Sequence, residues 1–253
     1  MTRIFGSIVL TLLLLTGCQS ETTSAPTDPL DLVTESARLI RQTSSFQMIV
    51  EQTGAPYYIL TDLGELVFRR ANAQYVAPDI MQASVRLLAL GGIPAEVDVF
   101  SKGDQQYYRN QILTANQWIN AEFAPGFNPQ KLIAEEEGFQ TALTALIGLN
   151  YVETTTLESG VEAHYLKATA RGEDVGALLA GLVYDLGETV NVDVYVDRAT
   201  GYPVRFIIVQ PGTETADEPQ PTTWTVDVFD FDGTPEVDPP PGIQLSLPAE
   251  GSS

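Results

Sequence analysis

Cysteine and histidine are almost absent from the 253-residue sequence, which contains one of each, Cys18 and His164. A single cysteine cannot form a disulfide within the chain, so the fold must depend on its hydrophobic core. A single histidine cannot form the histidine clusters of many transition-metal sites. The sequence also has neither a Gly-rich phosphate loop nor a Gly-x-Ser-x-Gly nucleophile motif. We therefore expect no enzymatic activity, no catalytic residue, no metal and no cofactor, and we interpret His164 as a hydrogen-bonded structural residue.

Positive charge is scarce as well. The chain has 13 Lys and Arg residues against 33 Asp and Glu residues, which gives a net charge of -20 at pH 7. A surface this acidic repels the phosphates of nucleic acids and of anionic phospholipids. Nucleic acid is therefore excluded as a partner by the charge balance.

The N-terminus has the pattern of an export signal. Arg3 precedes an apolar stretch over residues 8–15, which is too short for a bilayer span of about 20 residues but typical of a signal-peptide core. Leu15-Thr16-Gly17-Cys18 follows directly and resembles the lipobox of bacterial lipoproteins. The resemblance implies cleavage after residues 1–17, a diacylglyceryl group on the Cys18 sulfur, and a lipid-anchored protein on the extracytoplasmic face of the cell membrane. The alternative is an ordinary secretory signal with a chance cysteine.

The remainder of the chain divides into a tether, one domain and a tail. Residues 18–28 are small and polar and predict a flexible tether. The C-terminal segment is rich in Pro, Gly and acidic residues, so residues 241–253 are predicted to form an extended tail that packs only in part. No second linker interrupts residues 29–240, which we interpret as one domain.

Within this domain, helical and strand patterns alternate. Asp28-Pro29 is suited to cap and open a helix that ends near Ser44. Phe139, Leu143 and Ile147 have the spacing of one helix face, and they predict a helix within residues 129–149. A further helix is predicted at residues 174–186, which are apolar nearly all round. Alternation of apolar and polar residues predicts antiparallel strands over residues 46–52, 57–69, 74–88, 93–100, 105–110, 150–156, 161–168, 190–197, 203–210 and 222–231.

The last predicted strand is irregular. Val226 and Val228 share one face, whereas Phe229 and Phe231 fall on the other. A bulge or a change of face near Val228 would reconcile them. Acidic residues alternate with aromatic ones here and leave a calcium site conceivable, although no known calcium-binding loop is present.

Short motifs recur in order from the start of the domain to its end. They are Asp28-Pro29, Ser44-Ser45-Phe46, Tyr107-Tyr108-Arg109 with Trp118, Asn128-Pro129, Glu162-Ala163-His164-Tyr165, Val194-Tyr195-Val196-Asp197, Thr200-Gly201-Tyr202-Pro203-Val204-Arg205 and Phe229-Asp230-Phe231. Together, in this order, they resemble the LppX and LprG family of mycobacterial-type envelope lipoproteins.

This resemblance implies an α+β fold, a strongly curved antiparallel β half-barrel with helices covering the concave face, similar to the periplasmic lipoprotein carriers. It also implies that acyl chains of a lipid or glycolipid are bound in a hydrophobic cavity, and that the lipid is carried or presented within the cell envelope. An envelope transporter or another envelope protein is a possible partner.

The helix faces suggest which residues contact such a lipid. They are Phe139, Leu143, Ile147, Leu178 and Leu182. The same side chains could equally fill an ordinary core, because no motif fixes the lining of a cavity. A second hypothesis therefore stays open, in which the fold has a closed core and serves as a non-enzymatic scaffold or sensor that binds a protein partner.

Overall fold

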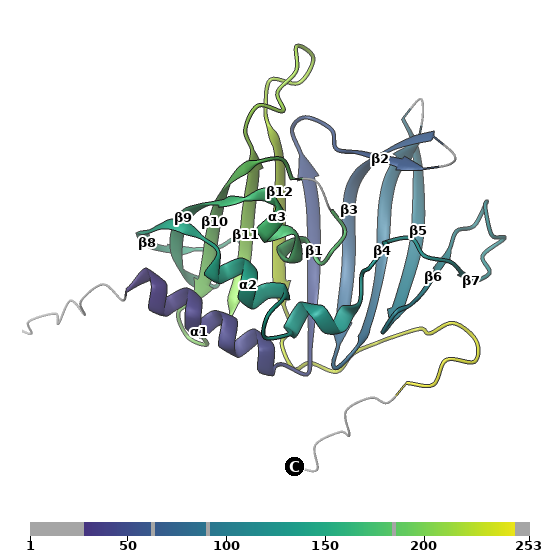
Figure 1. Ribbon diagram of the computed structural model, residues 1–253, viewed down its shortest axis with the longest axis horizontal. Helices are drawn as coiled ribbons and strands as arrows, with labels where there is room; N and C mark the ends of the chain where they lie inside the picture. The colour runs from purple at the N-terminus through teal and green to yellow at the C-terminus, as the bar shows by residue number, and fades with distance from the viewer. Residues whose placement is uncertain (1–27, 62–63, 90–91, 184–185, 246–253) are drawn as a thin grey trace, which may run out of the picture.

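The computed structural model describes residues 28–61, 64–89, 92–183 and 186–245 (Figure 1). They form a large antiparallel sheet with short helices on one face. The predicted α+β half-barrel is therefore confirmed. Cys18, the signal peptide and all of the tether except Asp28 lie outside the described residues.

The sheet has 12 strands, and its order begins and ends far from the chain termini. The hydrogen-bonded order is β7-β6-β5-β4-β3-β1-β12-β11-β10-β9-β8, with β2 paired to β3. The first and last strands of the chain thus meet in the middle of the sheet. The strands are β1 (Ser45–Thr53), β2 (Tyr58–Thr61), β3 (Gly64–Val76), β4 (Ile80–Ala89), β5 (Ile93–Lys102), β6 (Gln105–Arg109), β7 (Ile119–Asn120), β8 (Ile147–Thr156), β9 (Glu162–Arg171), β10 (Thr189–Asp197), β11 (Pro203–Gln210) and β12 (Thr222–Phe229).

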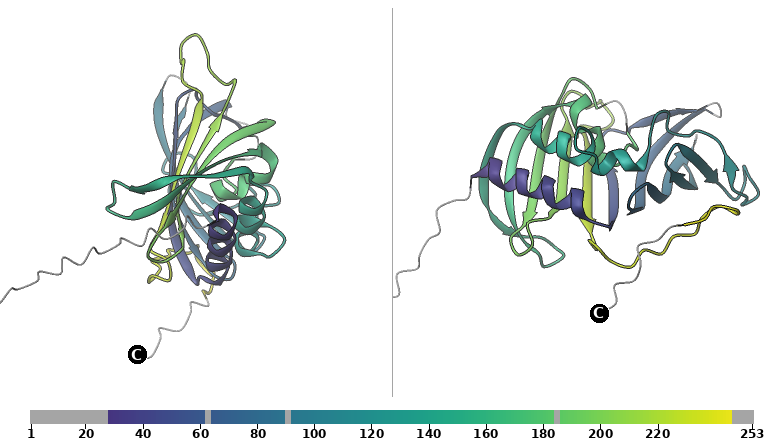
Figure 2. Two further views of the ribbon diagram at one scale, coloured as in Figure 1. Left: turned by 90° about the vertical axis from the view of Figure 1, so that its left-hand side faces the viewer. Right: turned by 60° about the horizontal axis from the view of Figure 1, so that its bottom comes forward.

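The helices lie together on the concave face of the sheet (Figure 2). The helical segments are α1 (Pro29–Gln42), the 3₁₀ turn η1 (Pro129–Ile133), α2 (Gly138–Thr144), α3 (Gly172–Val175) and the 3₁₀ turn η2 (Gly176–Leu179). Figure 1 shows that α1, α2 and α3 lie in front of the half formed by β1 and β8 to β12. Among the described residues, no α-helix lies in front of the half formed by β3 to β6, and η1 packs against β4 at its border.

The first helix begins as its sequence predicts. Asp28 accepts a hydrogen bond from the Leu30 backbone N at 2.9 Å, and Pro29 occupies the first turn. Val33, Ala37 and Ile40 are buried on one side of the helix. They pack into the main core because their spacing places them on a single face.

Strand alternation builds that core. In β10 the residues Val190, Val192, Val194 and Val196 are all at most 1% exposed, while the residues between them face outward. Phe139 of α2 contacts the ring of Phe46 at 5.8 Å between centroids, in an edge-to-face arrangement. Helix α2 is therefore fixed to the centre of the sheet by aromatic packing.

The predicted helix over residues 129–149 is shorter and interrupted. Residues 129–133 form η1, α2 ends at Thr144, and Ile147 begins strand β8. Gly138 explains the interruption, since its φ is +71° and a Cβ there would lie 2.2 Å from the Leu132 carbonyl oxygen. Only glycine fits this turn.

The predicted helix over residues 174–186 is also corrected. Helical structure covers only Gly172 to Leu179 and then stops, because Ala180 and Gly181 adopt left-handed φ values of 53° and 67°. The apolar residues that follow belong to an irregular segment rather than to a buried helix.

The C-terminal strand ends instead of bulging. Pairing of β12 with β1 is in regular register up to Phe229, and Asp230 and Asp232 then take left-handed φ values of 54° and 57°. Phe231 stacks on Tyr202 with ring centroids 4.1 Å apart. The change of face predicted near Val228 is therefore the end of the strand.

The convex face carries a second, smaller apolar cluster. Val76, Ile80 and Phe100 are buried there, although they alternate with residues of the concave face. Ile243 and Leu245 of the C-terminal segment pack against this cluster. Part of the segment predicted as a tail thus lies on the outside of the sheet.

Candidate functional site

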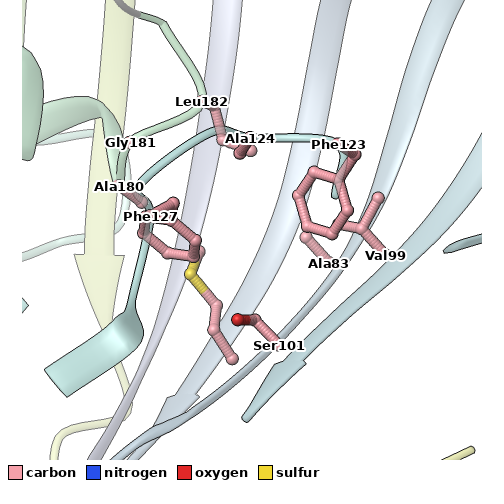
Figure 3. A pocket seen from close by; sticks show the side chains of 10 residues that line it. Ala83, Val99, Ser101, Phe123, Ala124, Phe127, Ala180, Gly181 and Leu182 are labelled. Atoms are coloured by element: carbon pink, nitrogen blue, oxygen red, sulfur yellow. The ribbon is translucent and has the colours of Figure 1, made fainter. Parts of the chain in front are cut away.

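An apolar pocket lies on the concave face of β4 and β5, in the half of the sheet that the α-helices leave uncovered (Figure 3). Its volume is about 10 Å³, room for about one water molecule. The walls come from two strands, the loop at residues 121–128, which we call the lid loop, and the turn after η2. The lining residues are Met81, Ala83, Val99, Ser101, Phe123, Ala124, Phe127, Ala180, Gly181 and Leu182.

The strands provide the floor of the pocket through their register. Ala83 of β4 is paired with Val99 of β5, and Met81 with Ser101. The same face continues along both strands through the pairs Val85–Val97 and Leu87–Ala95. Four successive pairs along one face extend for about 20 Å at 3.3 Å per residue. The pocket is therefore one part of a longer apolar stripe.

The lid loop is held by one buried side chain, Gln106 of β6, which is 4% exposed. Its amide nitrogen donates to the carbonyl oxygens of Ala124 at 2.7 Å and Phe127 at 3.1 Å. Its amide oxygen accepts from the backbone nitrogens of Phe123 at 3.0 Å and Ala124 at 2.9 Å. All hydrogen-bonding groups of this amide thus point at the lid loop, and they fix its position on the sheet.

A second contact closes the pocket from the other side. Phe127 packs directly over Gly181, where a Cβ would lie 2.5 Å from the Phe127 ring. Gly181 also has a φ of +67°, so a side chain would be disfavoured on both grounds. The lid loop is itself tied together, because the Gly126 nitrogen donates to the Glu122 carboxylate at 3.1 Å.

The lining is electrically neutral. It contains no Asp, Glu, Lys, Arg or His residue, and its one polar side chain is Ser101, whose hydroxyl donates to the Gly103 carbonyl oxygen at 3.3 Å. Such a surface offers no ligand for a metal and no group for acid–base catalysis. It can only exclude water and contact apolar groups.

The five residues predicted to contact a lipid lie in three different parts of the structure. Leu182 lines the pocket. Phe139, Leu143 and Leu178 are fully buried in the main core under the helices. Ile147 is 59% exposed at the start of β8, apart from the others.

Residues of the lid loop were missed by the helix-face argument. Phe123 and Phe127 lie in an irregular segment, where no periodicity indicates which side chains turn inward. Ala83 and Val99 could have been found, because strand alternation places them on the concave face with Val85 and Val97.

His164 and the acidic residues of the C-terminal strand form no site. Burial lowers the pKa of His164, with a further contribution from the charge of Arg198. Its Nδ1 is buried without a hydrogen-bond partner, so the expected hydrogen-bonded histidine is not found at this atom. Asp227 pairs with Arg205, and Asp232 accepts a hydrogen bond from the Ser44 nitrogen. In the described part of the chain, no cluster of His, Cys, Asp or Glu is arranged to hold a metal ion.

None of the helices described between residues 28 and 245 is long and apolar enough to cross a bilayer.

Comparison with known proteins identifies the fold. No family model matches the sequence, and no curated protein matches it. The crystal structure of the Mycobacterium tuberculosis lipoprotein LppX aligns over 84% of this chain and 100% of LppX, with a TM-score of 0.55 and 17% identity. The chain has the fold of LppX. LprF from Mycobacterium bovis aligns over 84% of this chain and 96% of its own, with a TM-score of 0.59 and 11% identity.

The LppX-like fold confirms the resemblance found from the short motifs. At these identities the likeness concerns the fold. The position of the pocket and its lid comes from the residues of this chain alone.

Proposed function

We propose that this chain is an exported lipoprotein, anchored through Cys18 to the extracytoplasmic face of the cell membrane. In this proposal it binds acyl chains of a lipid or glycolipid and carries or presents that lipid within the cell envelope, without catalysing a reaction. The lipobox-like motif supports the anchor, and the LppX-like fold with its apolar concave face supports the ligand class.

The observation that carries the proposal is the neutral pocket under the lid loop. An acyl chain needs a dry space of several hundred Å³, whereas the closed pocket has about 10 Å³. Binding therefore requires the lid loop to move. The lid loop is a coil segment, and its displacement requires the hydrogen bonds of Gln106 and the contact of Phe127 with Gly181 to break.

Displacing the lid loop would expose the stripe along β4 and β5. Val85 and Leu87 are each 7% exposed, and Val97 and Ala95 beside them are partly buried. An extended acyl chain laid along about 20 Å of this stripe would lose contact with water, and each CH₂ would contribute about 0.8 kcal/mol. One chain suffices for tight binding.

The closed pocket itself favours a second candidate function. Core side chains such as Phe139 and Leu143 are fully buried beneath the helices. A fold closed in this way could act as a scaffold or sensor that binds an envelope protein. In that case the lid loop would stay in place and no acyl chain would enter.

Substituting Ala83 with leucine is expected to separate the two functions. The mature chain carrying Cys18→Ser, which cannot be lipidated, would be titrated with a fluorescent fatty acid. We expect Ala83→Leu to weaken binding at least tenfold, because the added side chain occupies the floor of the pocket, and Ala83→Val to have a smaller effect. Thermal unfolding would verify that each variant folds.

Ser84→Leu is the matched control, since Ser84 is the next residue of β4 and faces the convex side. It should leave binding unchanged. Absence of fatty-acid binding by the folded reference chain would instead favour the scaffold or sensor.

A further inference from the structure

The loop between β6 and β7 exposes apolar side chains to an unusual degree. Ile112 is 88% exposed and Leu113 beside it is 58% exposed. Ile119, at the end of the loop, is 40% exposed. Single exposed aliphatic residues are common, but adjacent ones at the tip of a loop indicate an interaction surface.

The loop is built so that these side chains stay outside. Asn110 is 9% exposed, and its side-chain oxygen accepts from the backbone nitrogens of Ile112 and Leu113, each at 2.9 Å. Its side-chain nitrogen donates to the Glu96 carbonyl oxygen at 2.7 Å. The Thr114 hydroxyl accepts from the Asn110 backbone nitrogen at 3.0 Å. A buried amide thus fixes the loop in a shape that keeps both aliphatic side chains in water.

Charge sets this region apart from the rest of the chain. Between residues 105 and 121 the only charged side chain is Arg109, in a protein whose net charge is -20. Arg109 is already paired with Asp98 at 2.8 Å and with Asp238 at 3.0 Å, and its guanidinium lies 4.5 Å from the centre of the Trp118 ring. The loop tip is therefore an uncharged surface on a strongly acidic molecule, with Ile112 and Leu113 exposed beside polar residues such as Gln111.

We propose that residues 110–119 insert into the surface of a lipid bilayer, with Ile112 and Leu113 among the acyl chains and Trp118 at the level of the head groups. Tryptophan and arginine beside an aliphatic tip are the composition of membrane interfaces. Neutrality matters because any acid at the tip would be repelled by anionic lipid and would resist transfer out of water.

The insertion site connects directly to the lid loop. Strand β7 follows the tip, and the Ala121 nitrogen donates to the Gln106 carbonyl oxygen at 3.1 Å. The Gln106 side chain then holds the lid loop. A bilayer bound at residues 110–119 would therefore contact the segment that leads into the lid loop. This step rests on the proposed function, since it makes the bilayer the source or destination of the acyl chain.

The β6–β7 loop and the start of α1 lie far apart in the described structure. Figure 1 shows the start of α1, which follows the tether, at one end of the long axis and the β6–β7 loop at the other. The affinity of the loop for a bilayer can be measured without the anchor.

The test is vesicle flotation of the mature chain carrying Cys18→Ser, with phosphatidylcholine vesicles. We expect the chain to bind, and binding to fall at least tenfold in Ile112→Ser/Leu113→Ser. Ile112→Ser alone, at the most exposed position, should show a partial loss. Adding phosphatidylglycerol should weaken binding, because the protein is acidic. Brominated lipids should quench the fluorescence of Trp118. They should not quench that of Trp224, because this residue is fully buried.

Ile93→Ser is the control, since Ile93 is 64% exposed on another hairpin and should not affect flotation. Equal flotation of the double variant and the reference chain, or no flotation of either, would overturn the inference. Fatty-acid binding without vesicles is measured in parallel. If it persists while flotation does not depend on the loop, only this inference fails; if the loop binds vesicles but no fatty acid is bound, only the proposed function fails.

Discussion

Substituting Phe139 with alanine should lower the free energy of unfolding by about 3 to 5 kcal/mol. The ring is fully buried between Phe46 and Phe206, with centroid distances of 5.8 and 6.2 Å. Its loss would leave a cavity at the contact between α2 and the sheet, which the surrounding strands cannot close. Chemical denaturation of the variant and the reference chain would measure the change.

Phe229→Ala provides the matched control. Phe229 is 39% exposed on the convex side of β12, so its removal should cost about 1 kcal/mol or less. The comparison also decides the role of Phe139. A variant with nearly unchanged stability but without fatty-acid binding would show that this residue contacts the ligand and does not belong to the permanent core.

Substituting Gln106 with alanine should lower the free energy of unfolding by about 2 to 4 kcal/mol. The variant loses four hydrogen bonds to the lid loop, each contributing about 0.5 to 1.5 kcal/mol. It also removes the partner of the buried Ala124 backbone nitrogen, whereas the Ala124 carbonyl oxygen still accepts from the Phe127 nitrogen at 3.0 Å. Amide hydrogen exchange at Phe123 and Ala124 should become faster, because the lid loop opens more often.

Gln105→Ala is the natural comparison, since Gln105 is the preceding residue and is exposed. Its substitution should change neither stability nor exchange in the lid loop. Unchanged exchange in Gln106→Ala would contradict the view that this side chain fastens the lid.

The strands of the sheet could be predicted because the signal for each strand lies in the alternation of neighbouring residues. In β10 every second residue is a buried valine. Such alternation indicates a β-strand with one face buried in the core and the other exposed to solvent. The helix at Asp28 was equally predictable from its cap. The spacing of apolar residues and the capping of a helix depend on residues close together in the sequence. Neither signal requires the rest of the fold.

The helices over residues 129–149 and 174–186 could not be placed in this way. Gly138 interrupts the first helix because its backbone lies so close to the Leu132 carbonyl oxygen that a Cβ would be 2.2 Å from it. Composition does not reveal this contact. Ala180 ends the second in a left-handed conformation, which is uncommon for alanine. Helical spacing alone therefore put Ile147 on the wrong element.

The pocket was harder still to predict. Gln106 looks like a solvent-facing polar residue in a short strand, but it holds backbone groups 17 to 21 residues further along the chain. Phe127 meets Gly181 across an even longer separation. Such contacts exist only after folding, so the lid and its fastening had to come from the structure.

Mass spectrometry of the mature chain purified from its membrane tests the central claim most directly. Under denaturing conditions we expect a chain that begins at Cys18 and carries a covalent lipid. Under native conditions we expect a further, non-covalently bound lipid, whose amount falls in Ala83→Leu and not in Ser84→Leu. A folded native chain that never carries this second lipid, either as purified or after loading, would contradict the proposed lipid binding.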